Sequence, residues 1–432
     1  MKPADEVYQN YLAILKEELI AATGCTEPIA IAYAAAKARE LLGTLPERCQ
    51  IKASGNVIKN VKSVVVPNTG GLKGIAAAAA AGIVAGDASR QLEVIGDVTA
   101  SDQTRITHYL QTHLFQVEGA ENDAVFYIDV VLQGKENEAR VVIEGYHTHI
   151  VLMTRNGKPV YQTDSDAGSE DGLLDRSRMN VRDIVSFCDS VRLEDIEFVI
   201  GRQIDYNTAI SEEGLSGDWG ASIGKVLLAS YGTDIRTRAR AAAAAGSDAR
   251  MSGCEKPVVI VTGSGNQGIT ASLPVIEYAK ELHVSRDKLF RAVALSDLVT
   301  IHQKNGIGRL SAYCGAVSAG CGAGAGIAYL HGGDYDTIAH TIVNAVAITS
   351  GIICDGAKPS CAAKISAAVD AGIMGYAMYK NNQQFRSGDG IVTKGVDNTI
   401  RNVGLLATQG MRETDHEIIK IMLQHTQPNA CD

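Results

Sequence analysis

The sequence predicts an α+β fold in which a mainly helical domain carries an inserted antiparallel α+β domain. Three observations predict it. Apolar residues recur at helical spacing near the start of the chain. From about residue 92 to 161, charged residues increase, glycine decreases and short β-branched runs appear. Beyond residue 215 the chain is rich in Ala and Gly with a helical pattern. We therefore predict a helical domain made of residues 1–88 and 216–432, and an inserted α+β domain with linking helices at 89–215.

The first 88 residues predict three helices and two short strands. The sequence Gly-Cys-Thr-Glu-Pro at residues 24–28 separates the first two helices. Pro28 suits the first turn of the second helix, because its missing N–H has no helical partner there. In chain order the elements are a helix at 5–20, a helix at 29–42, strands at 50–53 and 61–66, and a small-residue helix that ends at 85.

The middle of the chain predicts one antiparallel sheet with a helix on it. The expected elements are a helix at 101–114 and strands at 124–132, 139–144 and 147–154. An acidic loop at 165–176 and two helices, at 181–191 and 193–213, connect this domain to the C-terminal part. There, an apolar run at 258–262 ends in the turn Gly-Ser-Gly-Asn-Gln-Gly at 263–268, and a helix follows.

The composition narrows the class of protein. Hydrophobic residues make up 46% and charged residues 21% of the 432 residues, which excludes intrinsic disorder. The net charge of −9 argues against nucleic acid as a main partner. No secretory signal opens the chain, and the Ala-rich stretch at 71–86 is too weakly hydrophobic to span a membrane. We expect a soluble cytoplasmic protein whose nine cysteines do not form a disulfide framework.

Four cysteines occur as two pairs with the same spacing, Cys314 with Cys321 and Cys354 with Cys361. Gly and Pro between the second pair predict a loop that can wrap a cofactor, as the converging ligands of a multi-iron cluster require. Zinc sites prefer closer Cys pairs. The alternative is that these cysteines pack as small hydrophobic side chains, most of all Cys321 in its Gly/Ala-rich segment. The remaining cysteines away from the motifs suggest nothing special; they are Cys49, Cys188, Cys254 and Cys431.

Cys25 is a candidate reactive thiol because it precedes a helix N-terminus. The positive end of the helix dipole lowers a thiol pKa, whereas the nearby Glu27 acts in the opposite direction. The alternative is a loop cysteine with no role.

Two turns that precede helices are candidate sites for a small carboxylate substrate, because backbone N–H groups there bind anions. The candidate residues are Asn68 and Thr69 in the first turn and Ser264 and Asn266 in the second. The alternative for each is a simple turn and cap. His302 is the best-placed candidate base, although a solvated helix surface explains it as well.

These motifs together resemble the L-cysteine desulfidase family, within the iron–sulfur-dependent serine dehydratase alpha-chain superfamily. The resemblance covers nearly the whole chain and rests on residues 24–28, 263–268, 314–317 and 354–361. It implies that the helical domain is catalytic and converts L-cysteine to pyruvate, ammonia and sulfide. It also implies a [4Fe–4S] cluster bound by Cys314, Cys354 and Cys361 with one iron open, and Cys25 as a base or a resting fourth ligand.

The sequence departs from the serine dehydratases in two ways. Cys354 and Cys361 are closer together than the last two ligands of those enzymes, which keeps Cys321 as a substitute for Cys361. The Ser-Ser-Ser-His signature of those enzymes is missing, which favours L-cysteine over L-serine.

Other functional hypotheses are based on the same motifs. The second turn also resembles the phosphate-binding turn of pyridoxal phosphate (PLP) dehydratases, with Lys225 or Lys256 as the Schiff-base lysine. L-serine dehydratase is a further enzyme alternative, and an iron–sulfur redox sensor is the non-enzyme alternative. The expected partners are a small amino acid and a second copy of the chain in a homodimer, with neither nucleic acid nor membrane.

Overall fold

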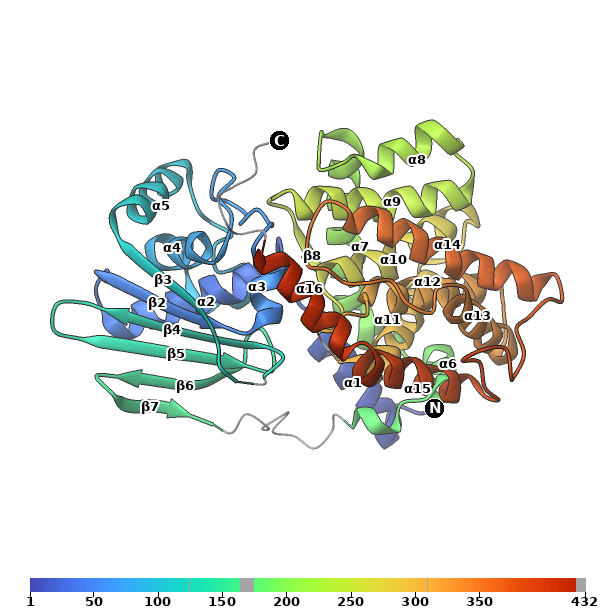
Figure 1. The fold of residues 1–432 in the computed structure, drawn as a ribbon. Helices are drawn as coiled ribbons and strands as arrows, with labels where there is room; N and C mark the ends of the chain where they lie inside the picture. The colour runs from blue at the N-terminus through green and yellow to red at the C-terminus, as the bar shows by residue number, and fades with distance from the viewer. Residues whose placement is uncertain (123, 164–174, 309, 425–432) are drawn as a thin grey trace.

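A computed structural model describes residues 1–122, 124–163, 175–308 and 310–424. Figure 1 shows a sheet with its covering helices beside a larger helical part, with α16 (Arg412–Gln424) running between them. This arrangement confirms the predicted α+β fold with a mainly helical part. Among the described residues, no helix combines the length and the hydropathy that crossing a membrane requires.

The sheet has six strands in the order β3-β2-β4-β5-β6-β7. The strands are β2 (Arg48–Ala53), β3 (Leu114–Gly119), β4 (Tyr127–Gln133), β5 (Glu138–Glu144), β6 (Ile150–Arg155) and β7 (Lys158–Gln162). The neighbouring strands are antiparallel except β2 and β3, which are parallel because several helices cross over between them. β2 comes from before residue 89, so this sheet combines residues from both sides of the predicted boundary.

The helices beside the sheet come from the first 112 residues. They are α2 (Thr26–Leu42), α3 (Gly55–Val61), α4 (Ile75–Ala85), the 3-10 helix η1 (Ala88–Glu93) and α5 (Ala100–Thr112). A Cβ on Gly82 would lie 2.1 Å from the carbonyl oxygen of Ala32, so glycine allows α4 to touch α2. The strand predicted at 61–66 is wrong: α3 covers its start, and Val64 and Val66 are buried outside any strand.

The helical part contains the remaining elements. They are α1 (Glu6–Glu18), α6 (Val181–Ser190), α7 (Leu193–Ser216), α8 (Ile223–Tyr231), α9 (Ile235–Met251), α10 (Gly265–Glu281), α11 (Arg286–Ile307), α12 (Gly315–Leu330), α13 (Tyr335–Ile348), α14 (Cys361–Lys380), α15 (Val396–Leu405), η2 (Arg176–Arg178), η3 (Leu406–Gly410) and the paired strands β1 (Ala21–Thr23) and β8 (Pro257–Val259). α6 packs on α11 and α7 on α9, so these linking helices lie with the helical part. Much of the predicted loop at 165–176 lies outside the described residues.

Small residues bring α12 and α14 together. A Cβ on Gly320 would lie 2.4 Å from the carbonyl oxygen of Ala368, and one on Gly324 would lie 2.6 Å from that of Gly372. Contacts that advance together along both helices mean that the helices run in the same direction. Their N-termini, where Cys314 and Cys361 lie, are therefore side by side.

Candidate active site

Four helices begin at one cavity of about 100 Å³. They are α2, α10, α12 and α14, and their N-cap residues are Cys25, Ser264, Cys314 and Ser360. None of these four side chains caps its own helix. The first N–H groups of a helix lack a helical acceptor, and the helix dipole makes that end positive. The cavity therefore favours negative charge, either on thiolates or on a bound anion.

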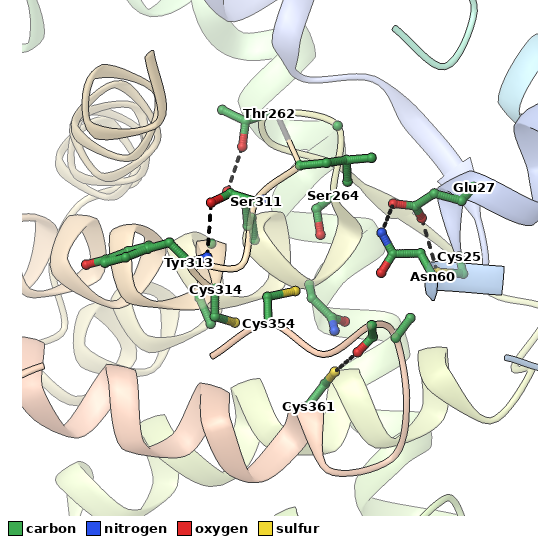
Figure 2. A pocket seen from close by; sticks show the side chains of 18 of the residues that line it. Cys25, Glu27, Asn60, Thr262, Ser264, Ser311, Tyr313, Cys314, Cys354 and Cys361 are labelled. Atoms are coloured by element: carbon green, nitrogen blue, oxygen red, sulfur yellow. Dashed lines mark hydrogen bonds between the residues drawn. The ribbon is translucent and has the colours of Figure 1, made fainter. Parts of the chain in front are cut away.

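Cys314 and Cys354 are held side by side by the backbone. The Cys314 N–H donates to the Ile352 carbonyl at 2.8 Å, and the Cys354 N–H donates to the Ala312 carbonyl at 2.7 Å. The interaction between the two side chains lowers the pKa of Cys354 and, together with burial, raises the pKa of Cys314. Figure 2 shows both sulfurs in the cavity with Cys361 below them.

Cys361 completes a set of three half-buried thiols in the cavity lining. It is the first residue of α14, and its thiol donates to the Gly356 carbonyl at 3.7 Å. Gly356 has φ +90° and lies against Lys59, so the loop that carries Cys354 can turn back towards α14. The loop predicted between these two cysteines therefore exists, and it ends at Cys361.

The donor set fits an iron–sulfur cluster better than a single ion. Within the described ranges, no three His, Cys, Asp or Glu side chains are grouped closely enough to hold one metal ion. A single ion draws all its ligands to one point, with metal–sulfur bonds of about 2.3 Å. In an iron–sulfur cluster different cysteines bind different irons, so three thiols around a shared cavity fit such a group.

Cys321 does not line this cavity. It is buried inside α12, and its thiol donates to the Ile342 carbonyl at 3.4 Å. Its position indicates packing against α13 rather than a substitute ligand. Cys49, Cys188 and Cys254 are also buried away from the cavity lining, and Cys431 lies outside the described residues.

Cys25 lies at the cavity but is not activated in the way the sequence suggested. Its thiol is 3% exposed and donates to Glu27 Oε2 at 3.4 Å. Burial, followed by the negative charge of Glu27, raises the pKa of Cys25 well above its usual value. Desolvation therefore acts against the helix dipole, and the structure favours a thiol at Cys25 over the expected thiolate.

The two candidate carboxylate turns lie in different places. Ser264 and Asn266 line the cavity. Asn68 and Thr69 are absent from its lining: their side chains donate to the Ile95 carbonyl at 2.8 Å and the Val66 carbonyl at 2.6 Å. Pro67, next to them, packs against Gly24, where a Cβ would lie 2.4 Å from the proline ring. In this structure the first turn supports the loop before Cys25.

Glu27 and His147 form a polar pair that the sequence did not single out as a site. His147 lies between β5 and β6 and enters the cavity from the sheet side, with Nε2 3.9 Å from Glu27 Oε1. Asn60 donates to the same Glu27 oxygen at 3.1 Å. Burial alone would raise the pKa of Glu27, but His147 and nearby groups lower it to about 2. His147 lay in an apolar run, so sequence pattern predicted only a strand.

Three further cations line the cavity, Lys59, Arg250 and Lys304. Lys59 is 3% exposed, pairs with Asp415 of α16 at 2.6 Å and approaches the Cys354 carbonyl at 3.5 Å. It therefore joins the C-terminal helix to the cysteine loop. Arg250 donates from Nε to the Gly24 carbonyl at 3.0 Å and from Nη1 to Asn266 Oδ1 at 3.1 Å.

Three other candidates lie away from the cavity lining. His302 pairs with Asp397 at 2.8 Å. Lys225 pairs with Asp218 at 3.0 Å and Lys256 approaches Glu213 at 3.9 Å, and both lysines are partly exposed. Neither lysine is therefore placed to bind a cofactor at the turn that contains Ser264.

The fold and the thiol-lined cavity define the class of protein. The chain matches the family described as "Serine dehydratase alpha chain" over residues 89–420, and it belongs to this family of iron–sulfur-dependent, dehydratase-like lyases. It is 59% identical to a UPF0597 protein of Desulfitobacterium hafniense (strain Y51), covering 98% of each chain. UPF0597 proteins of Lachnoclostridium phytofermentans and Finegoldia magna are each 48% identical, covering 96% of this chain and 100% of theirs.

Proposed function

We propose that this chain is an L-cysteine desulfidase, which eliminates sulfide from L-cysteine with a [4Fe–4S] cluster bound by Cys314, Cys354 and Cys361. The observation that carries the proposal is the meeting of these thiols with Cys25 and the Glu27–His147 pair in one cavity. The missing Ser-Ser-Ser-His signature supports L-cysteine over L-serine. When bound, the open iron would supply a Lewis acid for the leaving sulfur.

The elimination removes the α-proton and breaks the bond between Cβ and sulfur. The electron pair of the C–H bond forms the new double bond, and the sulfur leaves with the electron pair of the Cβ–S bond. The resulting aminoacrylate tautomerises to an imine, and one water then releases ammonia and pyruvate. The products are therefore pyruvate, ammonia and hydrogen sulfide from one L-cysteine and one water.

His147 is the side chain best placed to accept the α-proton. Its Nε2 is buried and has no hydrogen-bond partner within the described part of the chain. Glu27 Oε1 lies 3.9 Å from this nitrogen, so the carboxylate would stabilise the imidazolium that forms. The ring packs on Phe126 at 4.6 Å between centroids, which orients it.

Cys25 retains two proposed roles. As a base it would first transfer its proton to a neighbour, since its thiol donates to Glu27. As a resting fourth ligand it would leave the open iron when substrate binds. Its place beside the other cavity thiols supports the second role, because Cys25 and Cys361 share one buried cluster of side chains.

Anaerobic purification, with iron and acid-labile sulfide quantified, followed by assays of sulfide and pyruvate, tests the proposal. We expect a brown protein that releases sulfide from L-cysteine much faster than it converts L-serine. Faster turnover of L-serine would identify a serine dehydratase, the alternative that the family description favours. A colourless, iron-free protein with full activity would contradict the cluster. A sharp visible absorbance band that borohydride bleaches would indicate PLP instead. A stable cluster without turnover of any β-substituted amino acid would support the redox sensor.

A further inference from the structure

Arg250 is a buried cation that forms no ion pair with any residue that the structure describes. The side chain lies in the last turn of α9 and is 2% exposed. Among the described residues it forms no ion pair, and its two hydrogen bonds go to neutral oxygens, the Gly24 carbonyl and Asn266 Oδ1. A buried charge without a counter-ion is costly, so this arrangement needs a compensating anion.

The guanidinium lies directly on the first turn of α10. A Cβ on Gly265 would lie 2.3 Å from Arg250 Nε, so only glycine leaves room for the guanidinium there. The Ser264 side chain makes no capping bond to this helix. The cation and the free N–H groups of the helix therefore face the same part of the cavity.

Glu27, the carboxylate in the cavity lining, is not an ion-pair partner of Arg250. Glu27 feels the charge of Arg250, which helps to lower its pKa, but the two groups form no ion pair. The Glu27 oxygens instead accept from Cys25, Thr26 and Asn60. Arg250 Nη2 donates to no described residue, which leaves one edge of the guanidinium for a ligand.

We infer that Arg250 and the N-terminus of α10 form the receptor for the substrate α-carboxylate, and that Arg250 makes the enzyme specific for free amino acids. This inference rests on the proposed function, since it names the group of the amino acid that the cavity recognises. Nη2 and the N–H groups of the first turn donate to the two carboxylate oxygens, while Asn266 holds the guanidinium in place. An amide or ester in place of the carboxylate removes the negative charge that Arg250 requires.

The test compares L-cysteine with L-cysteinamide, which keeps the thiol, the ammonium group and the α-proton. Sulfide release is measured for the anaerobic, iron-loaded wild type and for Arg250→Gln, Arg250→Lys and Asn266→Asp. We expect Arg250→Gln to raise KM for L-cysteine about 10- to 100-fold while changing kcat/KM for the amide less than about threefold. Asn266→Asp, which adds a negative charge without changing size, is expected to reverse the preference towards the amide. Arg250→Lys keeps the positive charge but loses the paired N–H donors of the guanidinium, so an intermediate KM for L-cysteine is expected.

Arg202→Gln is the matched control, because Arg202 also donates to a backbone carbonyl, that of Leu19 at 2.7 Å, but does not line the cavity. It is expected to leave the preference for L-cysteine unchanged. Equal losses for both substrates in Arg250→Gln, together with an unchanged preference in Asn266→Asp, would overturn the inference and leave the proposed function standing.

Binding of L-alanine, which has no leaving group, separates the two hypotheses. Equilibrium dialysis with L-alanine and L-alaninamide is expected to show binding of the carboxylate alone, lost in Arg250→Gln. If no preparation releases sulfide from L-cysteine but this difference is present, the receptor stands and the proposed reaction fails. Equal binding of L-alanine by wild type and Arg250→Gln would refute the receptor.

Discussion

Asp297, in the core between α7 and α11, and Arg250, at the cavity, are both buried ionisable side chains without an ion pair among the described residues. The core carries no uncompensated charge at Asp297, because burial raises its pKa to about 8 and the side chain holds a proton. An arginine cannot lose its proton, so the charge of Arg250 remains. A buried charge that can neither lose its proton nor pair with another side chain therefore indicates a place for a charged ligand.

Helix N-termini differ in whether a side chain caps them and in whether they lie at the cavity. Away from the cavity, several helices are capped by their own side chains; examples are α5 by Thr99, α6 by Asn180, α9 by Asp234, α11 by Ser285 and α13 by Asp334. The four helices that begin at the cavity have no such cap, and neither do α1, α3, α4, α7, α8 and α15. The four differ from those six in that residues at their starts line the cavity. Their first N–H groups are therefore available to the proposed cluster thiolates and to the proposed substrate carboxylate.

The largest expected effect separates two cysteines on neighbouring elements. Cys354→Ser is expected to abolish both the bound iron and sulfide release, because it removes a proposed cluster ligand. Cys321→Ser should keep the iron, since Cys321 only packs against α13. Iron content per chain and sulfide release measure both variants. Equal iron content per chain in the two variants would contradict the proposal that Cys354, and not Cys321, is a cluster ligand.

Two histidines provide the next contrast. His147→Gln is expected to lower kcat about 10²- to 10⁴-fold with little change in iron content, because it removes the proposed base. His302→Gln breaks the pair with Asp397 at 2.8 Å and is expected to lower stability while kcat stays near the wild-type value. Steady-state kinetics and urea unfolding separate the two effects. A normal kcat for His147→Gln would remove this residue from the proposed mechanism.

Asp297→Asn tests how the core handles its buried acid. In the folded protein Asp297 keeps its proton up to about pH 8, whereas the unfolded chain loses it near pH 4. The folded state binds more protons between these values, so its free energy of unfolding falls as pH rises from about 4 to 8. The variant has no such proton. It should therefore gain stability relative to wild type as pH rises, measured by urea unfolding at pH 5 and pH 8.

The Asn side chain can also complete a local bond. Gln203 Nε2 donates to Asp297 Oδ1 at 3.0 Å, while Gln203 Oε1 and Asp297 Oδ2 have no partner among the described residues. An amide at position 297 offers both an acceptor and a donor to Gln203.

The pH experiment has a clear contrary outcome. If the difference in free energy of unfolding between Asp297→Asn and wild type is the same at pH 5 and pH 8, Asp297 is ionised in the folded protein.

The smallest expected effect compares two serines at helix starts. Ser285→Ala removes a capping bond to the Lys288 N–H at 3.3 Å, and a loss of about 1 kcal/mol in the free energy of unfolding is expected. Ser264→Ala removes no cap, so its stability should change less while KM for L-cysteine rises. Urea unfolding and kinetics on both variants test this. A larger stability loss in Ser264→Ala than in Ser285→Ala would show that the two helix starts do not differ in this way.

Sequence pattern predicted local elements well and some distant contacts poorly. The helices at both ends and the β-branched strands were predicted because their periodicity is local. The run at 61–66 was misassigned because its valines are buried by neighbouring helices and not by strand pairing. The parallel pairing of β2 with β3 was missed because it joins residues on either side of α3, α4, η1 and α5.

The sequence by itself determined the α+β class, the helix that begins after Cys25 and the loop between Cys354 and Cys361. These properties depend on residues that are close along the chain. Only the tertiary structure decided that His147 and Arg250 reach the same cavity and that Cys25 is buried enough to remain a thiol. Burial and long-range charge depend on which elements pack together, and no local pattern records that.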